Sequence, residues 1–230
     1  MKITWLGHAS FRIEIADQVL LLDPWLEGNP VFDQSRTDEM LAGATHILLT
    51  HAHFDHASEV AAVAKKTGVP VAGIFDFVSW ITEAEGIEGV GFNKGGTISI
   101  GEVAVTMVNA EHSSSFGGPH GPVYGGAEAG FMIAGEDKTL YVAGDTDVMA
   151  DMGVFAELHR PDYAILPIGG RFTMDAERAA FAAKKFFDFK AVIPAHYKTF
   201  DLLAQSADEF VRLMDPVKVH APEVMGTVEL

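Results

Sequence analysis

The chain has 230 residues, 48% of them hydrophobic, which is enough for one large domain with an extensive core. Its formal net charge of −16 opposes binding to polyanions, so a nucleic-acid partner is not expected. The absence of cysteine excludes disulfides, thiolate catalysis and any zinc site that contains cysteine.

No stretch of the sequence approaches the ~20 consecutive apolar residues that a membrane-spanning helix needs. The first residues enter a strand-like pattern at once, without an apolar signal region, so we expect a cytoplasmic protein. We expect residues 1–230 to form a single domain whose scattered acidic groups provide solubility. The composition is also compatible with a homo-oligomer.

Three short strands are predicted at the start of the chain, over residues 2–7, 10–15 and 18–23. His8 follows the first of them, and by its spacing alone a lone histidine there is more often structural than functional. Asp23 ends the third, where its carboxylate could accept a hydrogen bond from a ligand histidine or could cap a turn. These two polar residues are candidates whose roles depend on the rest of the chain.

The segment Thr-His-Ala-His-Phe-Asp-His-Ala-Ser-Glu at positions 50–59 carries the strongest chemical signal. A β-branched apolar run over residues 45–50 predicts a buried strand before it, and residues 60–66 predict a helix after it. The segment therefore lies on a strand-to-helix turn. Its candidate metal ligands are His51, His53, Asp55 and His56.

Imidazole and carboxylate groups are ligands that divalent zinc prefers, and that iron and manganese also accept. His51 and His53 alternate, so an extended backbone points both to the same side, while Asp55 and His56 can reach a second position nearby. The alternative is a polar loop in which Asp55 or Ser58 caps the following helix. Capping needs only one oxygen and does not explain three histidines, so the pattern favours a metal site.

The pattern His-x-His-x-Asp-His resembles the signature of the metallo-β-lactamase superfamily. The resemblance implies an α+β fold, a four-layer αββα sandwich of two mixed sheets flanked by helices, with one or two metal ions at its rim. Trp-Leu-Gly-His-Ala-Ser at positions 5–10 is similar to one branch, which contains ascorbate 6-phosphate lactonase, N-acyl phosphatidylethanolamine phospholipase and many uncharacterised metal-dependent hydrolases. In that branch the histidine equivalent to His8 lies near the metals, so the resemblance favours a catalytic role for it.

Further along, residues 69–74 predict a strand and residues 75–84 a helix, followed by strands over 97–100 and 102–110. The last of these strands ends just before His112. The resemblance implies that His112 supplies the third ligand of the first metal, beside the two alternating histidines of the central segment. The downstream position at the end of a strand is where the family pattern requires it.

Residues 116–130 contain six glycines and two prolines but no phosphate-loop spacing, so they do not predict a nucleotide site. We interpret them either as a flexible lid or rim beside the metals or as an ordinary long loop. His120 in this segment is a weak candidate for substrate contact.

A hairpin is predicted from strands over residues 131–134 and 138–143, and it runs into Gly-Asp-Thr-Asp at 144–147. The resemblance implies that Asp145 is a carboxylate that bridges two metals, since one carboxylate offers several lone pairs. Asp147 is then left to cap the helix predicted over residues 148–158.

The C-terminal part contains a predicted strand over residues 162–167, a helix over 175–187 and a last buried strand over 191–195. His196 at the end of that strand matches the final ligand of the family, joining Asp55 and His56 on the second metal. The weaker candidates for substrate contact here are Arg171 and Tyr197. Residues 202–214 predict a helix, and the tail over 217–230 is expected to edge a sheet.

The resulting hypothesis is a hydrolase with two divalent ions, zinc being favoured and manganese, nickel or iron being alternatives. Hydroxide formed between the ions would attack the carbonyl or phosphoryl centre of a small lactone, ester or phosphodiester, with Asp55 orienting it. Members that reduce oxygen at two irons carry Glu in place of His53, so a redox role is disfavoured. The alternatives are a nuclease of the transfer-RNA-processing type and a non-catalytic metal-binding or sensing module.

Overall fold

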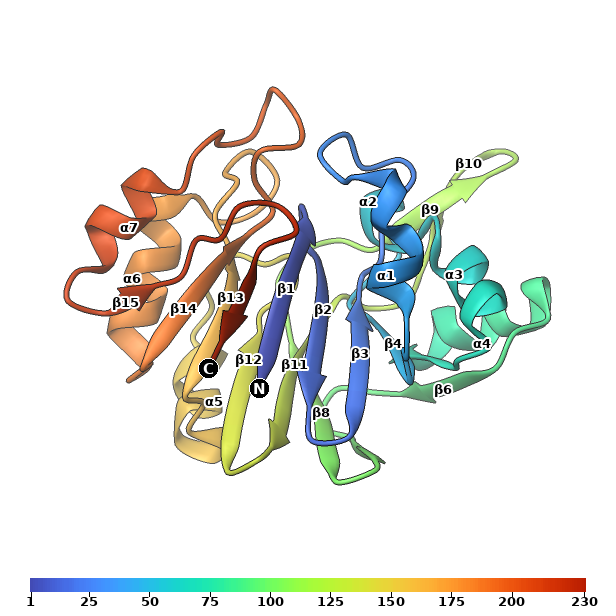
Figure 1. Ribbon diagram of the computed structural model, residues 1–230, viewed down its shortest axis with the longest axis horizontal. Coiled ribbons are helices and arrows are strands. Elements are labelled where there is room, and N and C mark those ends of the chain that lie inside the picture. The colour runs from blue at the N-terminus through green and yellow to red at the C-terminus, as the bar shows by residue number, and fades with distance from the viewer.

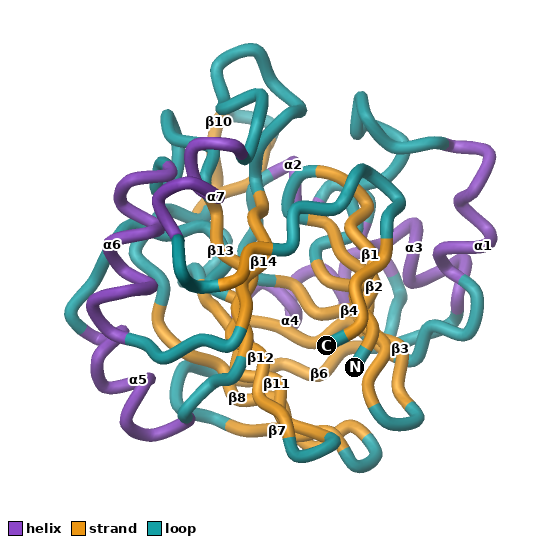
Figure 2. The backbone as a smooth tube through the Cα atoms, turned by 60° about the vertical axis from the view of Figure 1, so that its left-hand side comes forward, coloured by secondary structure: helices purple, strands orange, loops and turns teal.

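Two seven-stranded sheets pack face to face with helices on both outer sides, in the computed structural model that describes residues 1–230 (Figure 1). This is the four-layer α+β sandwich that the resemblance implied, and that prediction is confirmed. The tube view in Figure 2 shows the strands as the inner layers and the helices outside them. The longest helices have 11 residues, and none is long and apolar enough to cross a membrane.

The first sheet has the order β16-β1-β2-β3-β4-β5-β6. Its antiparallel strands β1, β2 and β3 are joined by short turns, whereas the parallel strands β3 to β6 are joined by longer crossovers that contain helices. The strands are β1 (Lys2–Gly7), β2 (Ser10–Ile15), β3 (Gln18–Leu22), β4 (His46–Leu49), β5 (Val71–Ile74), β6 (Gly89–Phe92) and β16 (Thr227–Glu229).

The second sheet has the order β15-β14-β13-β12-β11-β8-β7 and repeats the same plan. Its first half in sequence is antiparallel, and β12 to β15 are parallel. The strands are β7 (Thr97–Ile100), β8 (Val103–Asn109), β11 (Ala129–Gly135), β12 (Lys138–Val142), β13 (Tyr163–Pro167), β14 (Ala191–Ala195) and β15 (Lys218–Val219).

Helices cover the outer face of each sheet, so the parallel strands β4, β5 and β14 are buried on both faces and read as continuous apolar runs. The helix α6 presents a face of buried alanines, and its first turn is capped by the Asp175 carboxylate, which accepts from the Arg178 backbone N–H at 2.9 Å. The helices are η1 (Gln34–Arg36), α1 (Thr37–Leu41), α2 (Phe54–Ala57), α3 (Val60–Thr67), α4 (Phe75–Glu85), α5 (Asp151–His159), α6 (Ala176–Phe186) and α7 (Asp208–Met214).

The glycine-rich segment differs from its predicted loop. It forms a two-stranded hairpin of β9 (Ser115–Gly118) and β10 (Gly121–Tyr124), which projects from the sandwich beside α2 in Figure 1. Glycine and proline hide the alternation that identifies a strand, because neither contributes a side chain typical of a pleated surface. The same cause hid β6, which contains two glycines among four residues.

Two helix predictions were wrong at their N-termini. The helix expected from residue 148 begins at Asp151, and Asp147 does not cap it but pairs with the Arg178 guanidinium of α6. The helix expected from residue 202 begins at Asp208, after a run of turns. In the tail, β15 extends the second sheet and β16 returns to the first, so the prediction that the tail edges a sheet is confirmed.

Candidate metal centre

Six loops that follow strands gather at one edge of the sandwich. The first sheet contributes the loops after β1, β3 and β4, and the second contributes those after β8, β12 and β14. Strands with the same direction end at the same edge, so side chains that are distant in sequence meet there. In chain order these polar residues are His8, Asp23, His51, His53, Asp55, His56, His112, Asp145 and His196.

Three histidines form the first group. The ligand atoms of His51, His53 and His112 all lie within 4.8 Å of one another, and His51 Nε2 is 2.9 Å from His53 Nδ1. Burial lowers the pKa of each imidazole, most strongly that of the fully buried His51. All three rings are therefore neutral at pH 7, so each has a lone pair available to a metal ion.

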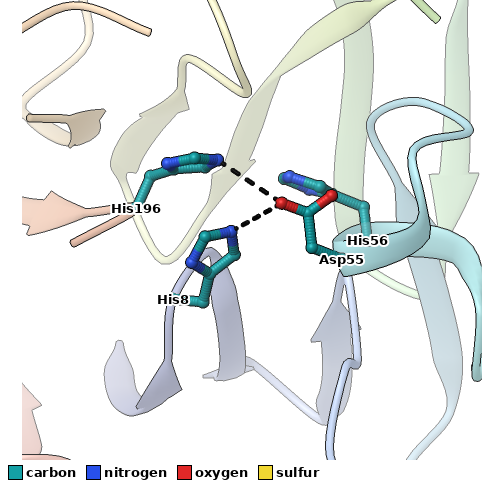
Figure 3. A group of neighbouring side chains, drawn as sticks. All are labelled: His8, Asp55, His56 and His196. Atoms are coloured by element: carbon teal, nitrogen blue, oxygen red, sulfur yellow. Dashed lines mark hydrogen bonds and ion pairs between the residues drawn. The ribbon is translucent and has the colours of Figure 1, made fainter. Parts of the chain in front are cut away.

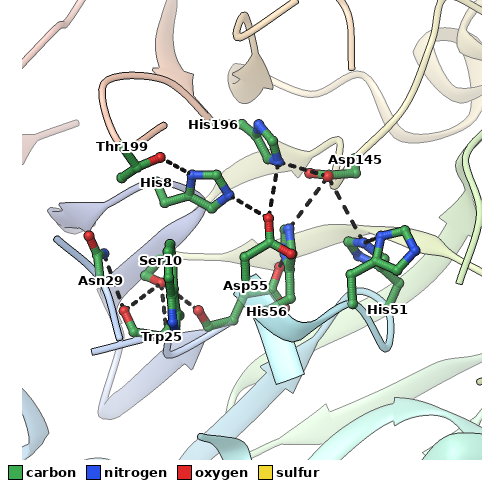
Figure 4. Close-up of polar contacts among 12 residues, drawn as sticks. His8, Ser10, Trp25, Asn29, His51, Asp55, His56, Asp145, His196 and Thr199 are labelled. Atoms are coloured by element: carbon green, nitrogen blue, oxygen red, sulfur yellow. Dashed lines mark hydrogen bonds and ion pairs between the residues drawn. The ribbon is translucent and has the colours of Figure 1, made fainter. Parts of the chain in front are cut away.

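A second group lies beside the first and contains His8, Asp55, His56 and His196 (Figure 3). The Asp145 carboxylate lies between the groups (Figure 4). Its Oδ2 is 3.0 Å from His196 Nε2 and 3.4 Å from His56 Nε2 in the second group. The same oxygen is 3.6 Å from His112 Nε2 and 3.9 Å from His51 Nε2 in the first.

Asp23 fixes the orientation of two of these histidines. Its Oδ2 accepts a hydrogen bond from His56 Nδ1 at 2.8 Å and another from the Thr50 hydroxyl at 2.6 Å. Since the Thr50 hydrogen is used in this way, its oxygen accepts from His51 Nδ1 at 3.0 Å. This network assigns the hydrogens of both rings to Nδ1 and leaves their Nε2 lone pairs facing Asp145.

Three buried atoms in the centre have no hydrogen-bond partner, namely His56 Nε2, Asp145 Oδ1 and His196 Nδ1. A lone pair that faces a carboxylate oxygen is repelled unless a proton or a metal cation lies between them, so the arrangement requires positive charge at this point. Burial opposes ionisation, yet Asp145 and Asp23 raise the pKa of His56 well above its ordinary value. Despite its own burial, the pKa of Asp145 is held well below the ordinary range by His196 and His56. Imidazole and carboxylate donors in this geometry fit divalent metal ions.

His8 is fully engaged with other protein groups. Burial and the nearby His196 lower its pKa to about 4, so the ring is neutral at pH 7. Its Nε2 donates to Asp55 Oδ2 at 2.9 Å, and its Nδ1 accepts from the Thr199 hydroxyl at 2.6 Å. Although burial opposes it, the bond from His8 lowers the pKa of Asp55, which is ionised. With neither ring nitrogen free, His8 holds Asp55 in place.

Three residues of the centre adopt left-handed backbone conformations, with φ of 55° at His8, 42° at Asp23 and 58° at His196. This region is uncommon for residues other than glycine, and such strain is often retained at functional sites. Each of the three directly follows a strand. Gly144 has φ of 66°, and a Cβ there would lie 2.5 Å from the Ala129 carbonyl oxygen, so only glycine fits before Asp145.

A cavity of about 450 Å³ lies over the centre. Its floor includes polar residues of both groups, and its walls are apolar. No lysine or arginine lines it. The apolar walls are formed by Phe54, Phe172, Phe200 and Leu202.

The three weaker candidates for substrate contact are not in this lining. His120 lies exposed at the turn of the β9–β10 hairpin, and Arg171 is exposed beside Phe172. Tyr197 is buried, and its ring stacks on Trp5 at 4.7 Å between ring centroids. Substrate contact by these residues stays a prediction. No sequence pattern identifies Thr50 or Thr199, because their hydroxyls act through contacts with residues brought close only by the fold.

The stacked position of Tyr197 predicts a structural effect on substitution. We expect Tyr197→Ala to reduce the free energy of unfolding by about 3–5 kcal/mol, as other buried aromatic truncations do. Tyr197→Phe keeps the stacked ring and should cost less than about 1.5 kcal/mol. Urea denaturation of both variants measures this. Equal losses of stability in the two variants would contradict the stacking argument.

Comparison with known proteins agrees with the geometry. The model of a beta-lactamase superfamily domain matches residues 2–196. The chain belongs to the beta-lactamase superfamily. Within the superfamily, a protein of Dinoroseobacter shibae described as a UPF0173 metal-dependent hydrolase is 64% identical, with both chains covered in full. A relative from Cereibacter sphaeroides with the same description is 58% identical over the full length of both chains.

Two solved structures also resemble this chain. A metallo hydrolase from the archaeon Ignicoccus hospitalis superposes with a TM-score of 0.87 and 31% identity, covering 99% of this chain and 97% of its own. A possible metal-dependent hydrolase from Veillonella parvula has a TM-score of 0.80 at 19% identity, covering 100% and 99%, and shows the shared fold. Membership of the superfamily, predicted from the His-x-His-x-Asp-His pattern, is confirmed.

The role of Asp23 in this superfamily member can be tested directly. We expect Asp23→Asn to weaken metal binding by about 10- to 100-fold, because the groups that orient ligand histidines typically contribute this much. Competition with a chromophoric chelator measures the dissociation constant. Asp201→Asn removes the same charge from an exposed loop and is the matched control. Equal affinities in the two variants would mean that charge alone, and not orientation, matters at Asp23.

Proposed function

We propose that this chain is a hydrolase of small-molecule lactones, esters or phosphodiesters that works with two divalent metal ions. The observation that carries the proposal is the position of Asp145 Oδ2, which lies 3.0–3.9 Å from four histidine nitrogens drawn from both groups. A single oxygen in this position suits a bridge between two cations, because a carboxylate has several lone pairs.

The ligands divide by geometry. His51, His53 and His112 would hold the first ion, with Asp145 shared between the two. Asp55, His56 and His196 would hold the second. When bound, two such ions polarise a carbonyl or phosphoryl oxygen and lower the pKa of water toward ~7.

Protein side chains position the attacking water and shield the cavity. Asp55 is ionised and can accept a hydrogen bond from the attacking water, and His8 keeps that carboxylate in position from behind. The apolar walls formed by Phe54, Phe172 and Phe200 limit the access of bulk water to the cavity. We therefore assign His8 as a positioning residue and Asp55 as the catalytic carboxylate.

Zinc is the metal we favour, with manganese, nickel and iron as alternatives. The donor set consists of five histidines and two carboxylates, and imidazole-rich sites of this kind suit zinc. The proposal includes a single domain over residues 1–230 in the cytoplasm and a small-molecule substrate, and it is compatible with a homo-oligomer. A nuclease is disfavoured because the net charge is −16 and no lysine or arginine lines the cavity.

The test combines metal analysis with a panel of substrates. We expect the zinc-loaded protein to contain about two ions per chain by plasma mass spectrometry, and to hydrolyse at least one generic lactone, ester or phosphodiester in a chelator-sensitive manner. Fewer than one ion per chain would overturn the two-metal proposal. Tight binding of metal with no turnover of any panel member would instead indicate a metal-binding or sensing module.

A further inference from the structure

A second cleft, of about 410 Å³, opens beside the metal cavity. It lies between α2, α3, α4 and the β9–β10 hairpin, which are neighbours in Figure 1. His53 and Phe54 line both the cleft and the metal cavity, so the two spaces adjoin at these residues. A volume of this size is within the range of small-ligand sites in proteins.

The wall of the cleft is aromatic. The Phe116 ring of the hairpin lies 4.2 Å from that of Trp80 and 5.3 Å from that of Phe77 on α4, between ring centroids. Trp80 is nevertheless 46% exposed, and large apolar side chains that remain exposed side by side often mark a binding surface. The small side chains of Ala57 and Ala61 also line the cleft.

Charge also distinguishes this surface. No lysine or arginine lines the cleft or the metal cavity, and the one acidic residue in the cleft, Glu85, is paired with Lys65 at 2.7 Å. A phosphate or carboxylate group in the cleft would therefore find no cationic partner, and its desolvation would not be compensated. An uncharged apolar group would have no charge to desolvate on entry, and burial of its surface would favour binding.

The hairpin wall is fixed to the metal loop at its base. The Ser114 hydroxyl accepts from the Ala52 backbone N–H at 3.2 Å, and the Gly125 N–H donates to the Ser114 carbonyl at 3.0 Å. A Cβ at Gly125 would lie 2.3 Å from that of Ala52, so the two segments touch directly. The hairpin that lines the cleft is therefore held against the loop that carries His53.

We propose that this cleft binds the apolar acyl arm of a neutral carboxylic ester or lactone whose carbonyl lies over the metal centre. The reaction itself rests on the function proposed above. In it the oxygen of water bonds to the acyl carbon, the acyl carbon–oxygen bond breaks, and the leaving alkoxide takes up one proton of the water. An ester gives a carboxylic acid with its apolar arm and an alcohol, whereas a lactone gives a single hydroxy acid.

Chain length is the first test. With zinc-loaded protein we expect kcat/KM for p-nitrophenyl esters to rise about fourfold per methylene from acetate through butyrate to hexanoate, the effect of burying each CH₂. Ala61→Phe, which fills the cleft, should bring the ratio between hexanoate and acetate close to one. Trp80→Ala, which removes one wall, should lower the ratio severalfold. Phe181→Ala removes an exposed aromatic ring on α6, outside both spaces, and should keep the native ratio.

Binding without reaction is the second test. Trp80 is the one exposed tryptophan of the three in the chain, so its fluorescence reports on the cleft. We expect 1-hexanol to half-saturate the fluorescence change of zinc-loaded protein at about fifteenfold lower concentration than 1-butanol, from two further methylenes. Ala61→Phe should remove this difference, and Phe181→Ala should preserve it.

The two tests separate the cleft from the reaction. If no ester is hydrolysed but the alcohols bind with the expected dependence on length, the proposed function fails and the assignment of the cleft stands. If esters are hydrolysed with equal kcat/KM at every chain length, or hexanol and butanol bind alike, the assignment of the cleft is overturned.

Discussion

Asp145→Ala is expected to lower kcat/KM for any substrate of this protein by about a thousandfold. Removing the shared carboxylate leaves four histidine nitrogens without the group that they surround. A metal that acts as a Lewis acid contributes several kcal/mol to transition-state stabilisation, and each ~1.4 kcal/mol corresponds to a factor of ten in rate. Metal content should fall from about two ions per chain to about one.

Asp147→Ala is the matched control, since Asp147 lies two residues away on the same loop but pairs with Arg178 at the surface. We expect it to retain native metal content and kcat/KM within about twofold, as surface substitutions usually change little. Steady-state kinetics and plasma mass spectrometry on the same preparations give both quantities. Native activity in Asp145→Ala would rule out a bridging role.

Removal of metal by a chelator is expected to lower Tm by roughly 8–16 °C. Ligand binding to the native state contributes about 4 kcal/mol when free metal is ~1,000 times Kd. For a domain of this size each kcal/mol changes Tm by roughly 2–4 °C. Asp145, His51 and His56 are almost completely buried, so without metal their mutual contacts remain uncompensated.

Differential scanning calorimetry before and after dialysis against chelator measures this change, and added zinc should restore the original Tm. Asp145→Ala serves as the comparison, because a protein that has already lost one ion should show a smaller decrease. A Tm that is the same with and without chelator would show that no tightly bound metal stabilises the fold.

The central histidine cluster could be predicted because its ligands are close in sequence. His112, Asp145 and His196 could be predicted because the resemblance implied ligands at these positions; each follows a strand, and the ends of such strands meet at one edge. What the sequence could not show is which loops touch. The contact of Asp23 with His56 joins residues 33 apart, and that of Thr199 with His8 joins residues 191 apart.

The second cleft escaped sequence reasoning for a different reason. Its wall is a hairpin rich in glycine and proline, and such a segment is typical of a loop when seen as sequence alone. The apolar face of α4 was predicted. The exposure of Trp80 beside Phe116 was not. The exposure of a side chain depends on its tertiary neighbours, and local periodicity in the sequence does not specify these.

Both sheets contribute metal-ligand candidates to one centre, the first sheet from a single loop and the second sheet from three separate loops. His51, His53, Asp55 and His56 follow β4 of the first sheet, whereas His112, Asp145 and His196 follow strands of the second. Metal bound by these donors would add a further link between the two sheets at the rim, where the His196 N–H already donates to the His8 carbonyl and the Ala129 N–H to the Thr50 carbonyl, both at 3.0 Å. Amide hydrogen exchange in β4 and in β12 should therefore become faster together when the metal is removed. A ligand that shifts one sheet relative to the other should alter metal affinity even if it binds outside the metal centre.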